Sequence, residues 1–182
     1  MAGSPWGEGA LERPRREARP TLFAIGYAAC HWCHVMAHES FEDERSAAYL
    51  NEHFVCVKVD REERPDVDAV YMQATTSMTG QGGWPMTVVL DHDGTPFFAG
   101  TYFPDQPRHG QPAFGQVLGA LSEAWRERRD DIREVAPPVL RHRLVTTFNA
   151  DADGITTDMV ISRLLDTIPL PLKEAAARAR RA

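Results

Sequence analysis

Two cysteines stand between an expected strand and an expected helix, and this feature restricts the possible folds more than any other part of the sequence. They belong to the stretch CHWCH at residues 30–34. Immediately before it, the compact apolar run TLFAIGY (21–27) predicts a buried strand. After it, apolar residues recur at helical spacing between residues 35 and 41. The fold must therefore lead from a buried strand through the cysteines directly into a helix.

The following segments extend this unit. A second buried strand is predicted at residues 53–60 (HFVCVKVD), where valines at alternate positions share one face and Cys56 lies on the other. Two strands joined through a helix make a βαβ unit, whose strands run parallel. Further along, the patterns predict a helix at 67–78, a strand at 86–90, its antiparallel partner at 95–103 and a helix from 114 to about 133.

The resulting order, β-α-β-α-β-β-α, matches an α/β protein with a thioredoxin-like fold, a central mixed β-sheet flanked by helices. The cysteines then lie at the carboxyl end of the first strand, the edge where open α/β sheets place their chemistry. The additional N-terminal strand that this fold can carry is not evident in the pattern. We expect an N-terminal segment at 1–19, the thioredoxin-like domain at 20–135, and an irregular or helical C-terminal extension at 136–182.

Charge and composition exclude several classes of partner. The net charge of −6 at pH 7 argues against nucleic acid, which requires a concentrated basic surface. No stretch approaches the roughly 20 apolar residues of a membrane span, and the N-terminus lacks the apolar run of a signal peptide. We therefore expect a cytoplasmic protein, in which structural disulfides are rare. In that compartment a CxxC pair indicates redox or metal chemistry.

The redox interpretation requires a thiolate at physiological pH. A cysteine just before a helix lies near unpaired backbone N–H groups, which stabilise the thiolate and lower its pKa. Cys30 has this position, and Cys33 lies in the first turn, where it can resolve a mixed disulfide. His31 and His34 can add positive charge. We expect Trp32 to be exposed, so that it shields the disulfide or contacts a partner.

The same stretch permits two other chemistries. CHWCH matches the haem-attachment pattern CxxCH literally, but haem of this type is normally attached outside the cytosol. A tetrahedral zinc site could use Cys30 and Cys33 together with His34 and His38. In zinc modules, however, the second pair of ligands usually comes from a distant segment. The redox interpretation is therefore favoured, and we expect no cofactor.

A second feature makes the redox interpretation more specific. Trp84-Pro85 immediately precedes the third predicted strand, and proline is tolerated at the start of a strand. In thioredoxin folds a cis proline at this point lies beside the CxxC pair, and the residue before it offers its backbone to an extended substrate. We therefore interpret Trp84 and Pro85 as substrate-binding residues.

Three long stretches, residues 30–54, 57–72 and 79–104, closely resemble the thioredoxin-like domain of the spermatogenesis-associated protein 20 family. The resemblance covers roughly residues 5–133. It implies a thioredoxin fold with Cys30 and Cys33 as the redox pair and Trp84-Pro85 as the cis-proline loop. Family members are typically several times longer, with a C-terminal helical toroid similar to the N-acylglucosamine 2-epimerase type, and we expect this chain to lack that toroid.

One departure concerns proton transfer. Thioredoxins carry a buried carboxylate six residues before the first cysteine, to accept the proton of the resolving thiol, and this chain has Ala24 there. His34, Lys58 and Asp60 are the candidates to replace it. The isolated Cys56 is expected to be a small buried residue, with a third redox thiol as the alternative.

The sequence thus predicts a thiol–disulfide oxidoreductase that acts on a protein or small-molecule disulfide, without nucleic acid or membrane as partner. Cys30 attacks the substrate disulfide and Cys33 resolves the mixed disulfide. Two alternatives stay open. One is a non-catalytic thioredoxin-fold module that binds a protein, and the other is a metal-binding domain that uses the cluster of cysteines and histidines.

Overall fold

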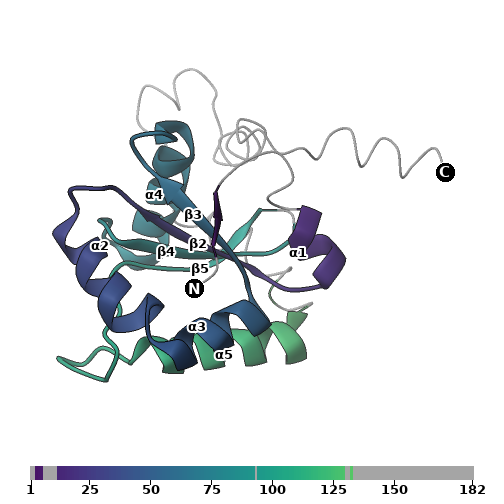
Figure 1. Cartoon of the computed structure of the whole chain (residues 1–182). Coiled ribbons are helices and arrows are strands. Elements are labelled where there is room, and N and C mark those ends of the chain that lie inside the picture. The colour runs from purple at the N-terminus through teal and green to yellow at the C-terminus, as the bar shows by residue number, and fades with distance from the viewer. Residues whose placement is uncertain (1–2, 6–11, 93, 130–131, 133–182) are drawn as a thin grey trace, which may run out of the picture.

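The computed structural model describes residues 3–5, 12–92, 94–129 and 132 (Figure 1). Its centre is a five-stranded sheet in the order β1-β3-β2-β4-β5. The strands are β1 (Ser4–Pro5), β2 (Thr21–Gly26), β3 (Val55–Asp60), β4 (Met86–Leu90) and β5 (Pro96–Gly100). Strand β2 is central because TLFAIG is apolar enough to be covered on both faces.

The register of the sheet brings three chain segments to one edge. Strand β2 runs parallel to β3, and their last residues, Gly26 and Asp60, are partners. Strand β4 runs antiparallel to β2, with its first residue Met86 opposite Ile25. The ends of β2 and β3 and the start of β4 therefore meet at the same edge. Any side chain just beyond these positions lies near the segment that carries the cysteines.

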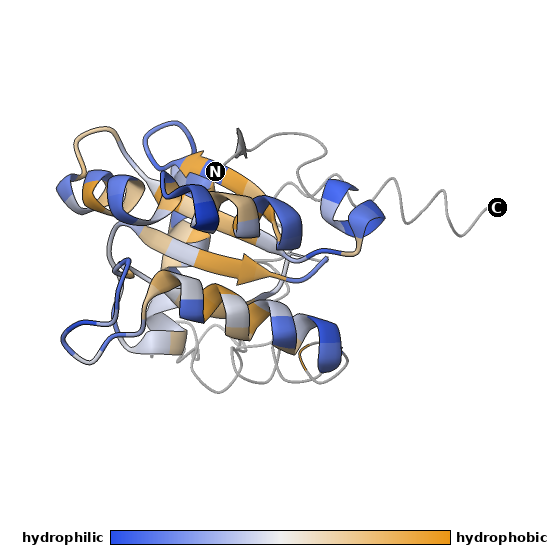
Figure 2. Cartoon of the chain, turned by 60° about the horizontal axis from the view of Figure 1, so that its bottom comes forward, coloured by the Kyte–Doolittle hydropathy of each residue, from blue (hydrophilic) through white to orange (hydrophobic). Residues whose placement is uncertain are grey.

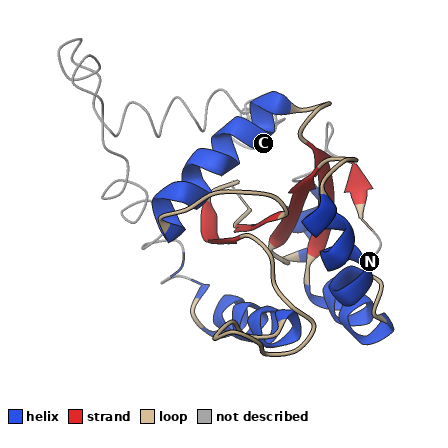
Figure 3. Cartoon of the chain, turned by 90° about the vertical axis from the view of Figure 1, so that its left-hand side faces the viewer, coloured by secondary structure: helices blue, strands red, loops and turns tan. Residues whose placement is uncertain are grey.

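Helices cover both faces of the sheet. Helix α4 (Pro65–Thr79) lies on one side, and α3 (Glu44–His53) and α5 (Phe114–Glu127) lie on the other (Figure 1). The remaining helical segments are α1 (Glu12–Glu17), α2 (His31–Met36) and the π-helical turn η1 (Ala37–Phe41). Strands are mostly apolar and helices mixed in polarity (Figure 2), and the strands stand between helices when the molecule is seen from its side (Figure 3).

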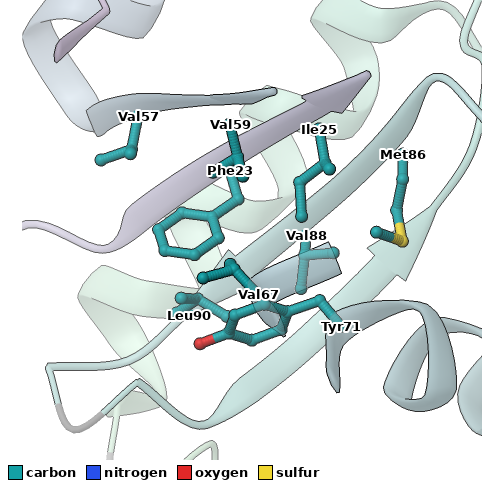
Figure 4. Packing of buried hydrophobic residues seen from close by; sticks show 9 residues of the cluster. All are labelled: Phe23, Ile25, Val57, Val59, Val67, Tyr71, Met86, Val88 and Leu90. Atoms are coloured by element: carbon teal, nitrogen blue, oxygen red, sulfur yellow. The ribbon is translucent and has the colours of Figure 1, made fainter. Parts of the chain in front are cut away.

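Each face of the sheet has its own buried core. Toward α4, alternate residues of three strands pack on Val67 and Tyr71 (Figure 4), and the Tyr71 ring meets the edge of Phe23 at 5.1 Å between centroids. The other core contains Leu22, Met36, Leu50, Phe54, Cys56, Val89, Phe114 and Leu118. The period-two alternation of β2 thus places Phe23 and Leu22 in different cores, as strand geometry requires.

The predicted thioredoxin-like α/β fold is confirmed, and the differences from the prediction are local. A two-residue N-terminal strand, β1, pairs with β3 although the sequence pattern does not reveal it. Helix α5 ends at Glu127 rather than near residue 133. The helix after the cysteines widens into η1, where the buried Ser40 hydroxyl donates to the Phe103 carbonyl at 3.3 Å. The predicted C-terminal extension lies outside the described residues.

A membrane-spanning helix would have to be long and apolar, and none of the helices in the described ranges meets both conditions.

Candidate active site

The two cysteines form a disulfide at the junction of strand and helix. Cys30 and Cys33 are bonded through their sulfurs, with their Cα atoms 5.2 Å apart. Cys30 is the N-cap of α2, and its sulfur accepts a hydrogen bond from the backbone N–H of Cys33 at 3.2 Å. The N–H of Cys30 donates to the Tyr27 carbonyl, also at 3.2 Å. The turn after β2 thus holds Cys30 so that a backbone donor of α2 points at its sulfur, as thiolate stabilisation requires.

Trp32 lies on the exposed side of the disulfide. Cys30 is only 4% exposed, whereas Trp32 is 54% exposed. Among the described residues, Trp32 is the one large hydrophobic side chain that is exposed. The edge of the Trp32 ring meets Tyr102 at 5.1 Å between centroids. The Tyr102 hydroxyl donates to Glu39, and burial together with this carboxylate raises the pKa of Tyr102. Trp32 is thus held next to the cysteines and presents an apolar surface to solvent.

A cleft of about 280 Å³ lies on the other side of the disulfide. Cys33 lines it together with Ala24, Lys58, Asp60 and Pro85. Ala24 is the partner of Lys58 in the β2–β3 ladder, so the methyl group at position 24 leaves this space between the strands and α2. Since a water molecule occupies about 30 Å³ of liquid volume, the cleft is large enough for several. Cys33, Lys58 and Asp60 therefore border one space that can hold water.

The segment before β4 contains Trp84 and Pro85, which the sequence analysis interprets as substrate-binding residues. The Trp84–Pro85 peptide bond is cis. Pro85 is buried and lines the same cleft as Cys33. The Trp84 side chain is partly buried and packs against the core on the α4 side. Trp84 and Pro85 thus lie at the sheet edge that carries the disulfide.

The side chains of His31, His34 and His38 do not line this cleft. His31 lies against Trp32, with 5.8 Å between ring centroids. The Nε2 atom of His34 lies 2.8 Å from the Ala28 carbonyl oxygen and therefore carries the proton as its donor. His38 pairs with Glu42, with 2.7 Å between Nδ1 and Oε2. Of the three candidates for proton transfer, only Lys58 and Asp60 share the cleft with Cys33.

The alternative metal set does not come together in this structure. Cys30 and Cys33 are bonded to each other, and His34 and His38 have the separate partners just described. Within the described ranges, no group of three or more histidine, cysteine, aspartate or glutamate residues is arranged to hold a metal ion.

Cys56 is buried in β3, as the strand pattern predicts, and is 4% exposed. It belongs to the core beneath α3 and α5, and its thiol lies 3.9 Å from the Leu50 carbonyl. Burial raises the pKa of this thiol to about 12. Because the thiolate is the reactive form of cysteine, we expect Cys56 to react slowly in the folded protein.

Three residues that the sequence analysis did not single out surround Trp84. They are Tyr27, Arg61 and Asp68. Asp68 is the one that the sequence could have indicated. It falls between Val67 and Tyr71, which share the apolar face of the predicted helix, and a carboxylate at the border of such a face calls for a partner.

Comparisons with known proteins give a consistent picture. Residues 2–143 match the protein family described as Thioredox_DsbH, a protein of unknown function, DUF255. Spermatogenesis-associated protein 20 of Homo sapiens is 45% identical over 130 residues, which are 71% of this chain and 16% of that protein. The uncharacterised protein B0495.5 of Caenorhabditis elegans is 39% identical over 149 residues, 82% of this chain and 20% of its own length. The resemblance noted in the sequence is therefore confirmed, and the chain spans at most about a fifth of these relatives.

Among solved structures, one described as DsbH oxidoreductase is similar to 70% of this chain and 88% of its own, with a TM-score of 0.50 at 18% sequence identity. At this identity the similarity concerns the fold. It agrees with the sheet order and with the helices found on the two faces.

Proposed function

This chain belongs to the Thioredox_DsbH (DUF255) family, and on that basis we propose that its thioredoxin-like domain is a thiol–disulfide oxidoreductase with Cys30 and Cys33 as its redox pair. One observation carries the proposal. The Cys30 sulfur caps α2 and accepts the Cys33 N–H, beside a loop that contains Pro85. A thiolate at this position is stabilised by backbone donors before any substrate arrives. The similar fold described as an oxidoreductase agrees with this activity.

The reaction begins with both cysteines reduced. The Cys30 thiolate attacks one sulfur of a substrate disulfide, which forms a mixed disulfide and releases the other substrate sulfur as a thiol after it takes up a proton. The Cys33 thiolate then attacks the Cys30 sulfur and releases the second substrate thiol. Two electrons have passed to the substrate, and the Cys30–Cys33 disulfide is restored. A dithiol donor must reduce it again before the next turnover.

The second step requires Cys33 to lose its proton. We propose that Asp60 accepts this proton through water in the cleft, which it shares with Lys58. Both side chains line the cleft with Cys33, whereas the His34 ring is engaged by the Ala28 carbonyl. Asp60 has one carboxylate oxygen bonded to the Glu62 N–H at 2.8 Å, which fixes the side chain. This pair would take the place of the carboxylate that thioredoxins carry at the position of Ala24.

The remaining parts of the proposal concern the substrate and its surroundings. Trp84 and Pro85 would align an extended substrate, and Trp32 with His31 would contact it from the exposed side. Residues 20–135 would form the functional domain, flanked by the segments 1–19 and 136–182. A protein disulfide in the cytoplasm is the substrate class that this arrangement fits best.

Catalysed reduction of insulin by dithiothreitol tests the proposal. The chain should accelerate the reaction well above the rate with dithiothreitol alone, and Cys30→Ser should remove the acceleration. If the unmodified chain gives no acceleration with this or any other protein disulfide, the domain acts as a binding module instead.

A further inference from the structure

The side chain of Trp84 is held from three sides. Its Nε1–H donates to Asp68 Oδ1 at 2.8 Å, and Asp68 is only 7% exposed. The guanidinium of Arg61 lies over the indole, with its central carbon 3.9 Å from the ring centroid. The Tyr27 ring meets the indole edge-on at 5.8 Å between centroids. We call these four residues, Tyr27, Arg61, Asp68 and Trp84, the Trp84 cluster.

Each member comes from a different segment around the site. Tyr27 follows β2, Arg61 follows β3, Trp84 precedes β4, and Asp68 lies in the first turn of α4. The backbone N–H of Arg61 donates to the Gly26 carbonyl at 2.9 Å, which fixes the Arg61 main chain against the end of β2. The Trp84 cluster therefore connects the loop that holds the cysteines to the loop that contains Pro85.

The chemistry of the cluster depends on Arg61 and Asp68 together. A buried carboxylate is costly unless it is hydrogen-bonded and paired with a cation. Here the indole N–H supplies the hydrogen bond, and Arg61 Nε lies 3.8 Å from Asp68 Oδ2. The planar guanidinium can pair with the carboxylate and stack on the indole at the same time, whereas a lysine ammonium cannot do both.

The main chain of Trp84 is available to a ligand. Between the described residues, no backbone hydrogen bond joins Trp84 to another element, although its side chain is fully engaged. Pro85, the next residue, lines the cleft that contains Cys33. An extended peptide can add its own N–H and C=O groups to such an unpaired segment, which is a common mode of peptide recognition.

We infer that Arg61 and Asp68 are positioning residues for the binding of an extended peptide disulfide, because they hold the Trp84 side chain so that its backbone faces the substrate. This inference rests on the proposed function. It predicts that the Trp84 cluster matters for disulfides within a polypeptide and not for small disulfides, which have no backbone to pair with Trp84.

The test compares two substrates with pre-reduced protein in single turnover. One is an unstructured peptide whose central cysteine is capped by cysteamine, and the other is bis(2-hydroxyethyl) disulfide. In Arg61→Leu, the half-saturation concentration for the peptide should rise about tenfold, the order of effect of losing a stacked cation. The rate with the small disulfide should change by less than about twofold, and the reduction potential should stay the same.

A matched control is available three residues further along the chain. Arg64 forms an ion pair with the exposed carboxylate of Asp66. Arg64→Leu should therefore leave the ratio of the two substrates unchanged. Asp68→Asn, which keeps an oxygen for the indole N–H but removes the charge, should have a smaller effect than Arg61→Leu. If Arg61→Leu does not fold, Arg61→Lys can replace it. This variant keeps the positive charge but lacks the planar guanidinium, and it should shift the same ratio.

The indole N–H resonance of Trp84, assigned through Trp84→Phe, reports whether the cluster has opened in each variant. The inference would be overturned if Arg61→Leu weakened the reactions with the peptide and with the small disulfide equally. It would also be overturned if neither reaction changed although this resonance had moved. A wild-type chain that reduces neither disulfide contradicts the proposed function itself, and that result is seen before any variant is compared.

Discussion

A Cβ atom added to Gly26 would lie 2.8 Å from the sulfur of Cys33. Gly26 is the last residue of β2, so the strand passes directly against the redox pair and only a hydrogen atom fits between them. A contact this short cannot persist, and one of the two partners would have to move. The size of the side chain at position 26 should therefore affect the stability of the Cys30–Cys33 disulfide.

Gly26→Ala should make the disulfide easier to reduce. In the oxidised form the Cys33 sulfur is held by its bond to Cys30, whereas in the dithiol its side chain can rotate away from the added methyl group. Overpacking of this kind costs roughly 1–3 kcal/mol, so the reduction potential should become more positive by about 20–60 mV, measured in defined glutathione buffers.

Gly119→Ala is the control for the glycine substitution. An added Cβ at Gly119 meets no atom within 4 Å, and the residue lies within α5. This variant should unfold at a slightly higher temperature, since alanine in a helix interior is favoured over glycine by roughly 0.5–1 kcal/mol. An unchanged potential in Gly26→Ala would show that the close approach has no influence on the redox pair.

Cys33→Ser should trap the reaction at its first step. Cys30 can still attack, but no thiol remains to resolve the mixed disulfide, so the adduct with a protein substrate should accumulate to one per chain in mass spectra. Cys30→Ser should give no adduct, because Cys33 lies inside the helix and Cys56 is buried. Adducts that form equally in both variants would contradict the assignment of the nucleophile.

Asp60→Asn should slow the second step in a pH-dependent manner. At pH 7 the loss of the proton acceptor should reduce the rate of resolution about a hundredfold, the lower limit of what a general base typically contributes. Above about pH 9 a thiol of ordinary pKa ionises without help, and the difference should disappear. Stopped-flow traces of mixed-disulfide decay measure this, with Glu62→Gln as the control on the same turn. An equal loss at every pH would indicate a structural role instead.

Cys56 should resist alkylation while the protein is folded. Burial raises its pKa to about 12, so at pH 8 only on the order of one thiol in ten thousand is ionised. Iodoacetamide should therefore modify Cys56 only after denaturant is added. Rapid modification of Cys56 in the folded, reduced protein would indicate that this part of the core opens.

The raised pKa of Cys56 also affects the stability of the protein at high pH. The unfolded chain loses the Cys56 proton near the ordinary value of 9.0, and the folded chain loses it only near 12. Between these values the folded state binds more protons, so stability falls as the pH rises through this window and is unaffected below it. Cys56→Ala should lack this contribution, and urea titrations at pH 8 and pH 10.5 compare the two chains.

The sequence was sufficient for the fold because the deciding patterns are local. The compositions of residues 21–26 and 55–60 indicate buried strands, which the structure contains as β2 and β3. The start of α3 is equally local, since the Asp43 carboxylate accepts the Ser46 N–H. Strand β1 is only two residues long and depends on β3 for its existence, so no local pattern marks it. The π-helical turn η1 likewise depends on the tertiary contact of Ser40 with residue 103.

For the site, the sequence identified the cysteines and the Trp84-Pro85 segment, but it could not rank the candidates for proton transfer. That ranking depends on which side chains face the cleft, since Asp60 lines it with Cys33 whereas His34 is bonded to the Ala28 carbonyl. The Trp84 cluster is the part that was missed. Arg61 belongs to a charged stretch that resembles an exposed turn, and its function becomes visible only when the indole beneath its guanidinium is placed. Asp68, at the border of an apolar helix face, indicated a partner but not which one.

The measurement that tests the central proposal most directly is the reduction potential of the Cys30–Cys33 pair. The chain is equilibrated in glutathione and dithiothreitol buffers, the thiols are trapped, and the masses are read out. We predict a single two-electron transition between roughly −120 and −270 mV, the range of working thiol–disulfide oxidoreductases. If Cys30 and Cys33 never form a disulfide, or do so only after a chelator has removed a metal, the proposed function is wrong.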